Sequence, residues 1–404
     1  MVTGPDLRLP NPLRRAHLLL VALAYAVAAA CLPAPNALPE VSPAPSVTGT
    51  APEPSARPSA LALVTPSPTA SATSKARPVT APYGVVVTGL FGPALQASSY
   101  TVALVGADGR TAASATAARV LIGPEISTVS ASASRLYFLD GPSRLRSLTP
   151  DGASAVVRDF AVGPGERVAF AVSPDDLRIA VAVIDVAAPT NSVRVYVEDL
   201  GGGGHRDLLT SQTRVMWPVG WRGSQLVLGT REDRCPVCDT FYFPSGYVVV
   251  DSSTGSTLVE VCTGGAEQDL TRNATPAGVL CVKNRGTQDR LTVDTVVAGW
   301  DGSERVVPMS CWAQGGSLSP NGELIADIEY PPCRQGHLRL LDRSGRSAAP
   351  PGFPEDGWPG GWIDDRHLVY RATNYRLMVV DIVTAKVSPV EAEGTFVASL
   401  PPNL

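Results

Sequence analysis

Residues 171–184 read AVSPDDLRIAVAVI, in which two apolar runs flank the polar stretch Ser173-Pro174-Asp175-Asp176. Proline presets the backbone for a turn, and aspartate side chains hydrogen-bond to nearby backbone amides. The stretch therefore predicts a β-hairpin. Two adjacent carboxylates could also bind a metal ion or act as an acid/base pair, so the rest of the chain has to decide between these interpretations.

The same hairpin pattern recurs in SLSPNGELIADI, WPVGWRGSQLVL and WPGGWIDDRHLVY, at residues 317–328, 217–228 and 358–370. Each copy has an apolar residue before a polar turn and an apolar strand after it. The position of the two aspartates is taken there by Asn321-Gly322, Gly223-Ser224 and Asp364-Asp365. Because the position accepts turn-forming residues in general, we expect Asp175 and Asp176 to turn the chain and to have no chemical role.

A second repeat predicts the architecture. From residue 83 onward the chain has β-branched runs and Gly or Asp turns without a helical period, which is typical of an all-β fold. An apolar strand ends in a turn seven times, at intervals of 39 to 52 residues, at Asp108, Asp151, Asp199, Asp251, Asp301, Asp342 and Asp381. This interval is that of a four-stranded propeller blade. We expect a seven-bladed β-propeller over residues 83–404, with six blades and an extra N-terminal strand pair as the alternative.

Two further strands, YGVVVTGL at 83–90 and GTFVASL at 394–400, have no place in the repeats. Their pairing would close the ring and remove exposed sheet edges. The run at 170–210, FAVSPDDLRIAVAVIDVAAPTNSVRVYVEDLGGGGHRDLLT, resembles the TolB-like (WD-repeat-like) β-propeller repeat. That resemblance implies the fold and little about function, since propellers support binding, scaffolding and catalysis alike.

The N-terminus has the pattern of an export signal. Basic LRR at 13–15 precedes the apolar stretch AHLLLVALAYAVAAA and then Cys31, which predicts a signal peptide over 1–30. VAAAC resembles a bacterial lipobox, although Ala28 stands where leucine is commonest. We expect lipidation of Cys31 and an extracytoplasmic, membrane-anchored protein, with plain secretion after Ala30 or an uncleaved anchor as alternatives.

Residues 31–82 form a segment rich in Pro, Ala, Ser and Thr, with no aromatic residue. Such a composition cannot bury enough apolar surface to fold, and we expect a disordered tether. The chain as a whole is 44% apolar and 17% charged with a net charge of −4. This balance excludes general disorder and disfavours nucleic acid as a partner, because phosphate backbones attract basic surfaces. We expect a monomer whose partner is another envelope protein or an envelope polymer.

Six cysteines follow Cys31, and we expect structural disulfides in an oxidising compartment. Cys311 and Cys333 are equally distant from the Gly322 turn, and Cys262 and Cys281 flank the turn TRNATP. The remaining two, Cys235 and Cys238, either pair with each other or lie near the second pair. Half a zinc site or a redox role for this CxxC motif stays open.

The sequence contains no recognisable catalytic motif, and we assign no catalytic residue, metal or cofactor. His205, His337 and His367 each fall in a predicted turn or strand start without a ligand at suitable spacing. The pairs Trp217/Trp221 and Trp358/Trp362 are interpreted as blade core, with a sugar-stacking platform as the alternative.

One segment, EDRCPVCDTFYFPS at 232–245, is longer than its counterparts in the other repeats. Propellers place recognition on such loops, and aromatic residues beside charges suit an interface. The candidate recognition residues are Glu232, Asp233, Arg234, Asp239, Phe241, Tyr242 and Phe243. An elongated hairpin that covers the blade edge is the alternative.

We therefore expect a non-catalytic, membrane-tethered propeller that binds a protein or envelope ligand through its loops. The alternative is a hydrolase or lyase with catalytic residues at the central channel, and a sensor domain is a third possibility. Clustered His, Arg and carboxylate groups at the channel mouth would favour the enzyme, and a mostly neutral opening would favour binding.

Overall fold

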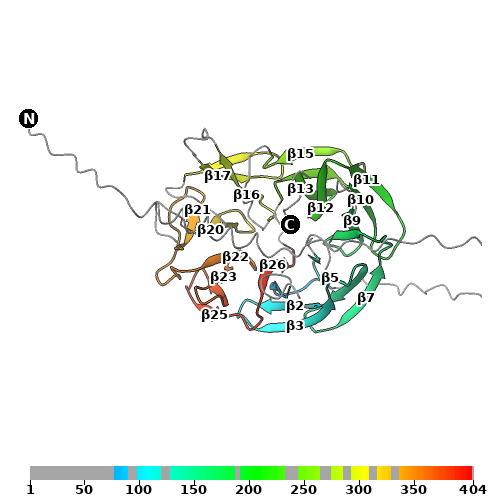
Figure 1. Cartoon of the computed structure of the whole chain (residues 1–404). Helices are drawn as coiled ribbons and strands as arrows, with labels where there is room; N and C mark the ends of the chain where they lie inside the picture. The colour runs from blue at the N-terminus through cyan, green and yellow to red at the C-terminus, as the bar shows by residue number, and fades with distance from the viewer. Residues whose placement is uncertain are drawn as a thin grey trace, which may run out of the picture. The chain divides into compact units, whose positions relative to one another are not determined.

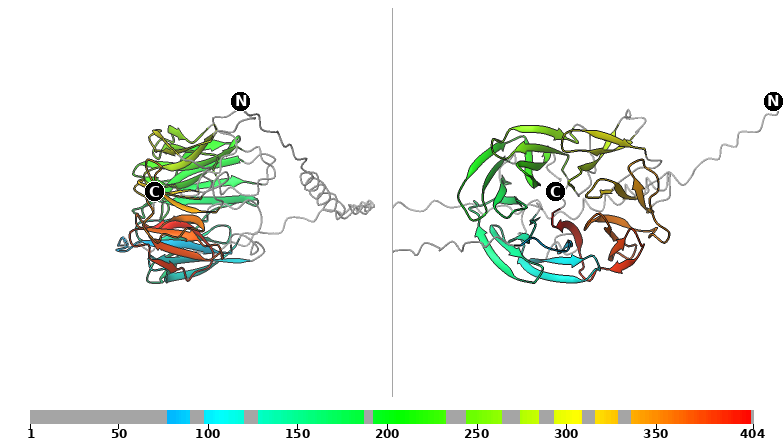
Figure 2. Two further views of the ribbon diagram at one scale, coloured as in Figure 1. Left: turned by 90° about the vertical axis from the view of Figure 1, so that its left-hand side faces the viewer. Right: turned by 180° about the vertical axis from the view of Figure 1, so that it is seen from behind.

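The chain folds into seven small antiparallel sheets arranged in a ring, which is the architecture of a seven-bladed β-propeller (Figures 1 and 2). The computed structural model describes residues 77–89, 98–119, 128–186, 192–232, 244–263, 274–284, 293–308, 316–328 and 336–402. The all-β class and the count of seven blades are confirmed, and the six-blade alternative is wrong. The predicted signal peptide, Cys31 and nearly all of the predicted tether lie outside these ranges.

The first blade closes the ring with strands from both ends of the domain. Its strand order is β26 (Thr395–Leu400), β1 (Tyr83–Thr88), β2 (Ser99–Gly106) and β3 (Thr111–Ala118). Tyr83 pairs with Leu400 in antiparallel register. The two strands left over from the sequence repeat therefore pair as predicted, which hides the sheet edges that either would expose alone.

Blades two to four have four strands each, and in each the chain runs from the centre of the ring outward (Figure 1). Blade two contains β4 (Val129–Ala131), β5 (Leu136–Asp140), β6 (Arg144–Leu148) and β7 (Ser154–Asp159). Blade three contains β8 (Glu166–Val172), β9 (Arg178–Asp185), β10 (Ser192–Asp199) and β11 (Arg206–Ser211). Blade four contains β12 (Arg214–Arg222), β13 (Gln225–Glu232), β14 (Gly246–Asp251) and β15 (Thr257–Val261).

Blades five and six have three described strands each. They contain β16 (Val279–Asn284), β17 (Val293–Ala298) and β18 (Glu304–Val307), then β19 (Ser317–Leu318), β20 (Leu324–Ile328) and β21 (Leu338–Asp342). In blade six, a single bridge from Leu341 to Ser347 stands in place of the outer strand. Blade seven contains β22 (Trp358–Trp362), β23 (His367–Arg371), β24 (Leu377–Asp381) and β25 (Val387–Pro389).

This strand order gives the ring two different faces. The turns between first and second strands, such as 173–177, lie on one face together with the turns between third and fourth strands; we call it the turn face. The connections between second and third strands, such as 372–376, lie on the opposite face together with the connections between blades; we call it the loop face. Val79 donates its amide hydrogen to the Ala133 carbonyl at 2.9 Å in the turn 132–135, so the domain begins on the turn face.

The core lies between neighbouring blades, because each sheet packs on both sides. Between blades three and four, for example, Ala169, Ala171, Val193 and Val195 pack with Trp217 and other residues of blade four. The second tryptophan of each WPxGW motif links two blades. Trp221 Nε1 donates to the Ala171 carbonyl at 2.9 Å, and Trp362 Nε1 donates to the Ser317 carbonyl at 3.1 Å.

The predicted turn chemistry holds for Asp175. Its Oδ1 accepts hydrogen bonds from Ser173 Oγ at 2.6 Å and from the Leu177 amide at 3.2 Å. Asn321, at the equivalent position of blade six, accepts from the Ser319 hydroxyl at 2.8 Å in the same way. An amide oxygen can thus replace the carboxylate, which is expected of a side chain that only stabilises a turn.

The prediction that Asp176 only turns the chain is wrong. Its backbone has φ 60°, and its largely buried carboxylate contacts blade two. Tyr137 donates its hydroxyl hydrogen to Asp176 Oδ1 at 2.7 Å, Ser134 donates to Oδ2, and Arg135 Nε lies 3.9 Å from Oδ2. Desolvation and the nearby carboxylate raise the pKa of Tyr137, so its hydroxyl keeps its proton and donates. Asp176 therefore links blade three to blade two.

The turns between third and fourth strands repeat one stabilising device. In four of these turns a serine or threonine hydroxyl donates a hydrogen bond to the aspartate carboxylate, and this bond is the main cause of the lowered carboxyl pKa. The four aspartates are Asp151, Asp251, Asp301 and Asp342. The pKa of Asp342 falls to about 2. At Asp381 the main cause is the Arg366 guanidinium, which donates to both carboxylate oxygens. The repeated aspartate is thus explained by turn stability.

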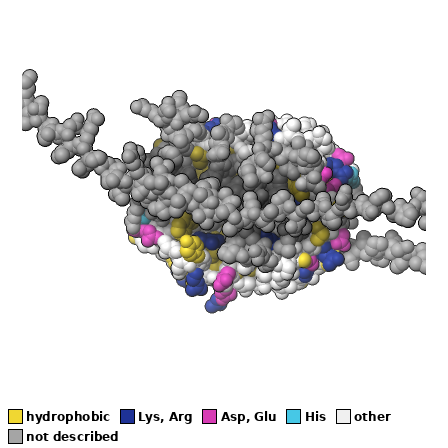
Figure 3. All heavy atoms as spheres, in the orientation of Figure 1, with side chains coloured by type: hydrophobic (Ala, Val, Ile, Leu, Met, Phe, Trp, Pro, Cys, Tyr) yellow, Lys and Arg dark blue, Asp and Glu magenta, His cyan; other side chains and the backbone are white. Residues whose placement is uncertain are grey.

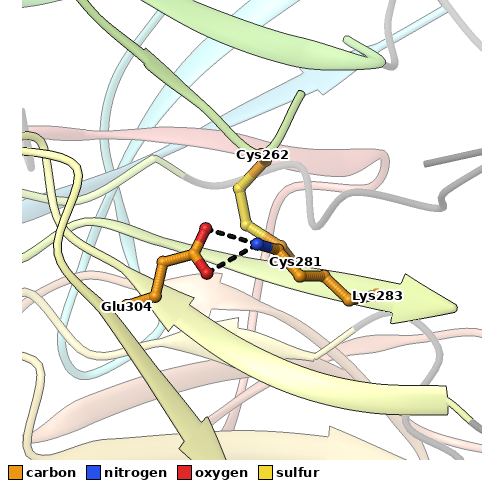
Figure 4. Close-up of a disulfide and its surroundings, with 4 residues drawn as sticks. All are labelled: Cys262, Cys281, Lys283 and Glu304. Atoms are coloured by element: carbon orange, nitrogen blue, oxygen red, sulfur yellow. Dashed lines mark hydrogen bonds and ion pairs between the residues drawn. A yellow bond between two sulfur atoms is a disulfide. The ribbon is translucent and has the colours of Figure 1, made fainter. Parts of the chain in front are cut away.

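A disulfide joins blades four and five (Figure 4). It connects Cys262, directly after β15, to Cys281 on β16, with the two Cα atoms 5.9 Å apart and both residues buried. On the same strand Lys283 forms an ion pair with Glu304 of β18 at 2.5 Å. These two cysteines flank a turn in the sequence, as expected of a pair. Four other disulfide candidates fall on segments that the structure does not describe: Cys235, Cys238, Cys311 and Cys333.

Candidate functional site

The predicted recognition loop starts and ends on the loop face. Its first residue, Glu232, is the last residue of β13 and pairs with Arg214 at the start of β12, and β14 resumes at Gly246 on the same face. The other six candidates, Asp233, Arg234, Asp239, Phe241, Tyr242 and Phe243, are beyond the described ranges, as is the side chain of Glu232. The structure therefore places the two ends of the loop on the loop face, and its recognition role stays a prediction.

The four tryptophans of the two WPxGW motifs do not behave alike. Trp217, Trp221 and Trp362 are at most 3% exposed and belong to the core, as predicted. Trp358 is 39% exposed, so the prediction of blade core is wrong for this residue. The difference follows from the paired strand: Trp217 packs on Gly229, whereas the residue paired with Trp358 is Arg371.

Trp358 forms an exposed aromatic pair with Tyr375 on the loop face. The two ring centroids are 6.5 Å apart, the ring planes differ by 11°, and Tyr375 is 74% exposed. Trp358 is the first residue of the innermost strand β22, and Tyr375 lies in the turn between β23 and β24. We call these two residues the aromatic platform. Sugar stacking by Trp358 was the alternative prediction, and Tyr375 was not predicted. The feature of the sequence that indicates Tyr375 is the turn ATNYR, which begins directly after the strand paired with Trp358.

The turn that carries Tyr375 is closed by hydrogen bonds. The Tyr375 amide donates to the Ala372 carbonyl at 2.8 Å, and the Ala372 amide donates to the Arg376 carbonyl at 2.9 Å. Asn374 Oδ1 accepts from the Arg376 amide at 3.1 Å. Tyr375 itself has φ 66°, a left-handed conformation that costs roughly 1–2 kcal/mol for a residue with a bulky side chain. The tyrosine ring is thus presented by an ordered and strained turn.

The base of the platform is tied to the next blade. Arg371 donates from its guanidinium to the Gly394 carbonyl at 2.9 Å and to Thr395 Oγ1 at 3.3 Å, at the start of β26. The polar residues Asp356, Asn374 and Arg376, each within two positions of a platform residue, are exposed. Charged side chains of both signs are also interspersed around the rim of the face in Figure 3. The residues next to the aromatic pair in the sequence thus include exposed hydrogen-bonding groups of both charges.

The innermost strands are apolar along their middle positions. In β8 the charged residues Glu166 and Arg167 come first, and in β12 Arg214 and Arg222 are the two end residues. Two of these charges have structural partners, because Glu166 accepts the Gly163 amide hydrogen at 2.5 Å and Arg214 lies 3.1 Å from Glu260. Between these ends the strands consist mainly of Val, Ala, Phe, Met, Trp and Pro, so the described centre of the ring is mostly neutral.

The three histidines of the domain lie apart from one another. His367 contacts both oxygens of Asp364 at 2.9 Å in the first turn of blade seven, and His205 lies 3.4 Å from Asp207 in the outer hairpin of blade three. His337 forms a backbone bridge with Asp356. Among the described residues, no three His, Cys, Asp or Glu side chains are arranged to hold a metal ion. The described part of the chain also contains no helix with the length and hydropathy needed to cross a membrane.

No family model and no curated protein matches the chain. Solved structures with a similar arrangement include an oligogalacturonate lyase in complex with manganese, at 11% identity and TM-score 0.47, which covers 78% of this chain and 97% of its own. TolB from Acinetobacter baumannii has 15% identity, TM-score 0.39 and coverages of 76% and 79%. Hydrazine synthase from Kuenenia stuttgartiensis has 12% identity, TM-score 0.41 and coverages of 80% and 98%. At such values the propeller assignment rests on the seven sheets of this chain itself.

Proposed function

We propose that the protein is an extracytoplasmic, membrane-tethered propeller that binds a protein or cell-envelope ligand through its loop face. The observation that carries this proposal is the aromatic platform, in which Trp358 and Tyr375 expose two near-parallel rings on an ordered turn. Tryptophan and tyrosine supply much of the binding energy at interfaces, because they combine a large apolar surface with a polar group. A strained turn that presents such a ring suits a binding role.

The position of the chain ends supports a tethered orientation. The described chain enters the domain on the turn face, where Val79 bonds to Ala133, and the last strand ends there with Leu400 paired to Tyr83. The platform lies on the opposite face. In this proposal the segment that follows Cys31 joins the domain at its turn face, opposite the platform.

The competing interpretation is a hydrolase or lyase that acts at the centre of the ring. Catalysis there would require titratable groups that converge on one point. The described innermost strands carry their charges at their ends and are apolar between them, which favours binding.

Membrane attachment depends on Cys31 in this proposal. In cells that export the protein, we expect the wild type in the membrane fraction and a Cys31→Ser variant in the soluble extracytoplasmic fraction, because the serine cannot carry the thioether-linked lipid. Fractionation followed by immunoblotting measures both. Wild-type levels of the variant in the membrane fraction would rule out Cys31 as the anchor.

Binding through the loop face is tested by photo-crosslinking in intact envelopes. We expect a benzoylphenylalanine in place of Tyr375, or in place of the neighbouring Arg376, to form a discrete adduct with an envelope component. The matched control is the same group at Val383, which is 66% exposed in the same blade but on the turn face. Equal adducts from both faces, or none from either loop-face position, would overturn the proposed function.

A further inference from the structure

We propose that the aromatic platform binds the pyranose rings of an envelope polysaccharide. This inference rests on the proposed function and names the class of ligand for the same site. It is carried by three features of the platform: the flat exposed rings, the hydrogen-bonding groups near them in the sequence and the strained backbone at Tyr375.

The ring geometry suits a sugar. A pyranose ring has a face of C–H groups, which packs on the flat face of an aromatic ring through apolar burial and the ring quadrupole. Trp358 and Tyr375 offer two such faces that differ by 11° in orientation, with their centroids 6.5 Å apart. Both rings are exposed, so a pyranose can pack against this aromatic pair.

The exposed polar residues within two positions of Trp358 and Tyr375 match sugar hydroxyls, each of which can both donate and accept a hydrogen bond. The carboxylate of Asp356 accepts and the guanidinium of Arg376 donates, both with planar geometry suited to paired hydroxyls. Asn374 uses its Oδ1 for the Arg376 amide, and the structure gives its Nδ2 no bond to any described residue. All three side chains are exposed.

A proline-rich peptide, including the chain's own segment before residue 77, is the other occupant to consider, since aromatic grooves also bind polyproline. Proline has no backbone N–H, so a polyproline stretch offers fewer donors per residue to the Asp356 carboxylate than a pyranose with its several hydroxyls. A hydroxyl-rich ligand uses the donors and the acceptors of the platform together, and the observations therefore favour the sugar.

The backbone at Tyr375 is strained, which is uncommon for a residue with a side chain. Four non-glycine residues of the described chain have positive φ: Asp176, Cys262, Tyr375 and Ala385. The side chains of Asp176 and Cys262 each link two blades, through hydrogen bonds and a disulfide. The ring of Tyr375 lies against that of Trp358, so the strained residue is part of the platform.

The test is isothermal titration of the full-length protein, purified in mild detergent, with cellohexaose, chitohexaose and mannohexaose. We expect at least one of the three to bind, and a Tyr375→Gly variant to bind it about tenfold more weakly, since one stacking face is lost. Glycine also accepts the positive φ, so this variant should melt at or above the wild-type temperature. Tyr375→Phe should retain binding, and Val383→Ala on the turn face should leave it unchanged.

Three outcomes would overturn the inference: no hexasaccharide binds at millimolar concentration, binding survives Tyr375→Gly, or a peptide of residues 41–60 binds in a Tyr375-dependent way while the sugars do not. The proposed function has a separate outcome. A protein adduct at position 375 together with silent sugar titrations would remove the sugar and keep the loop-face function, whereas the absence of any adduct would remove both.

Discussion

Replacing Asp176 with glycine is expected to lower the free energy of unfolding by about 3 kcal/mol. The side chain of Asp176 is 13% exposed and accepts hydrogen bonds from Ser134 and Tyr137 of the neighbouring blade. The substitution leaves the Tyr137 hydroxyl, in a residue 1% exposed, without its acceptor and removes the partner of Arg135. Loss of a buried acceptor that serves several donors costs more than one ordinary hydrogen bond. Glycine relieves the positive φ, so the measured loss belongs to the link between the blades.

Urea denaturation of the wild type and three variants measures this effect. Asp175→Asn is the matched control, because Asn321 shows that an amide oxygen performs the same turn function, and it should change stability by less than about 0.5 kcal/mol. Tyr137→Phe should be destabilising, and a double-mutant cycle with Asp176→Gly should show coupling above about 1 kcal/mol. If Asp176→Gly unfolds at the wild-type midpoint, the carboxylate acts only in the turn.

Loss of the disulfide between blades four and five is the second large effect that we expect. The Cys262→Ala/Cys281→Ala variant should lose about 3 kcal/mol, because the bond closes a loop with a sequence separation of 19 and its removal returns that freedom to the unfolded chain. The two cysteines are 4% and 0% exposed, so alanine also leaves a small cavity.

Denaturation of the oxidised wild type, the reduced wild type and the double variant measures this loss. Reductant should lower the unfolding midpoint of the wild type toward that of the double variant and should change the double variant much less. Mass spectrometry of protein from its native compartment should show the peptides of Cys262 and Cys281 joined. Free thiols at both positions would contradict the disulfide.

Both effects concern contacts between blades, and other contacts between blades position the platform. Trp358 lies on an innermost strand that also packs against strands of both adjacent blades, and Arg371 ties its partner strand to β26. A ring that is held at each blade junction keeps the platform residues in a constant geometry. A binding site assembled this way loses less conformational entropy when a ligand binds.

The sequence determined the fold because its evidence was local and repeated. Strand runs with turn residues between them recur at a nearly constant interval, and each copy independently predicts the same strand-turn-strand unit. Seven copies therefore specify seven blades, and two unassigned strands at opposite ends specify the closure. The turn role of Asp175 was equally readable, since its partners Ser173 and Leu177 are two residues away.

The candidate site was only half predictable from the sequence. WPVGW and WPGGW are nearly identical, yet Trp217 is buried and Trp358 is exposed. Gly229 beside Trp217 leaves room for the indole, whereas Arg371 occupies the corresponding place beside Trp358. This contrast appears only when the strand register is known, and Tyr375 then completes the platform from the adjacent turn.

Tertiary structure alone decided what Asp176 does. The residues at 175–176 and 321–322 fill the same turn, but Tyr137 and Ser134 of the preceding blade face Asp176, while a Cβ on Gly322 would lie 2.7 Å from Ala277. Each turn of the repeat thus meets a different neighbour across the blade junction. A sequence repeat specifies the unit through short-range hydrogen bonds, and the contacts between units depend on how the packed ring brings their surfaces together.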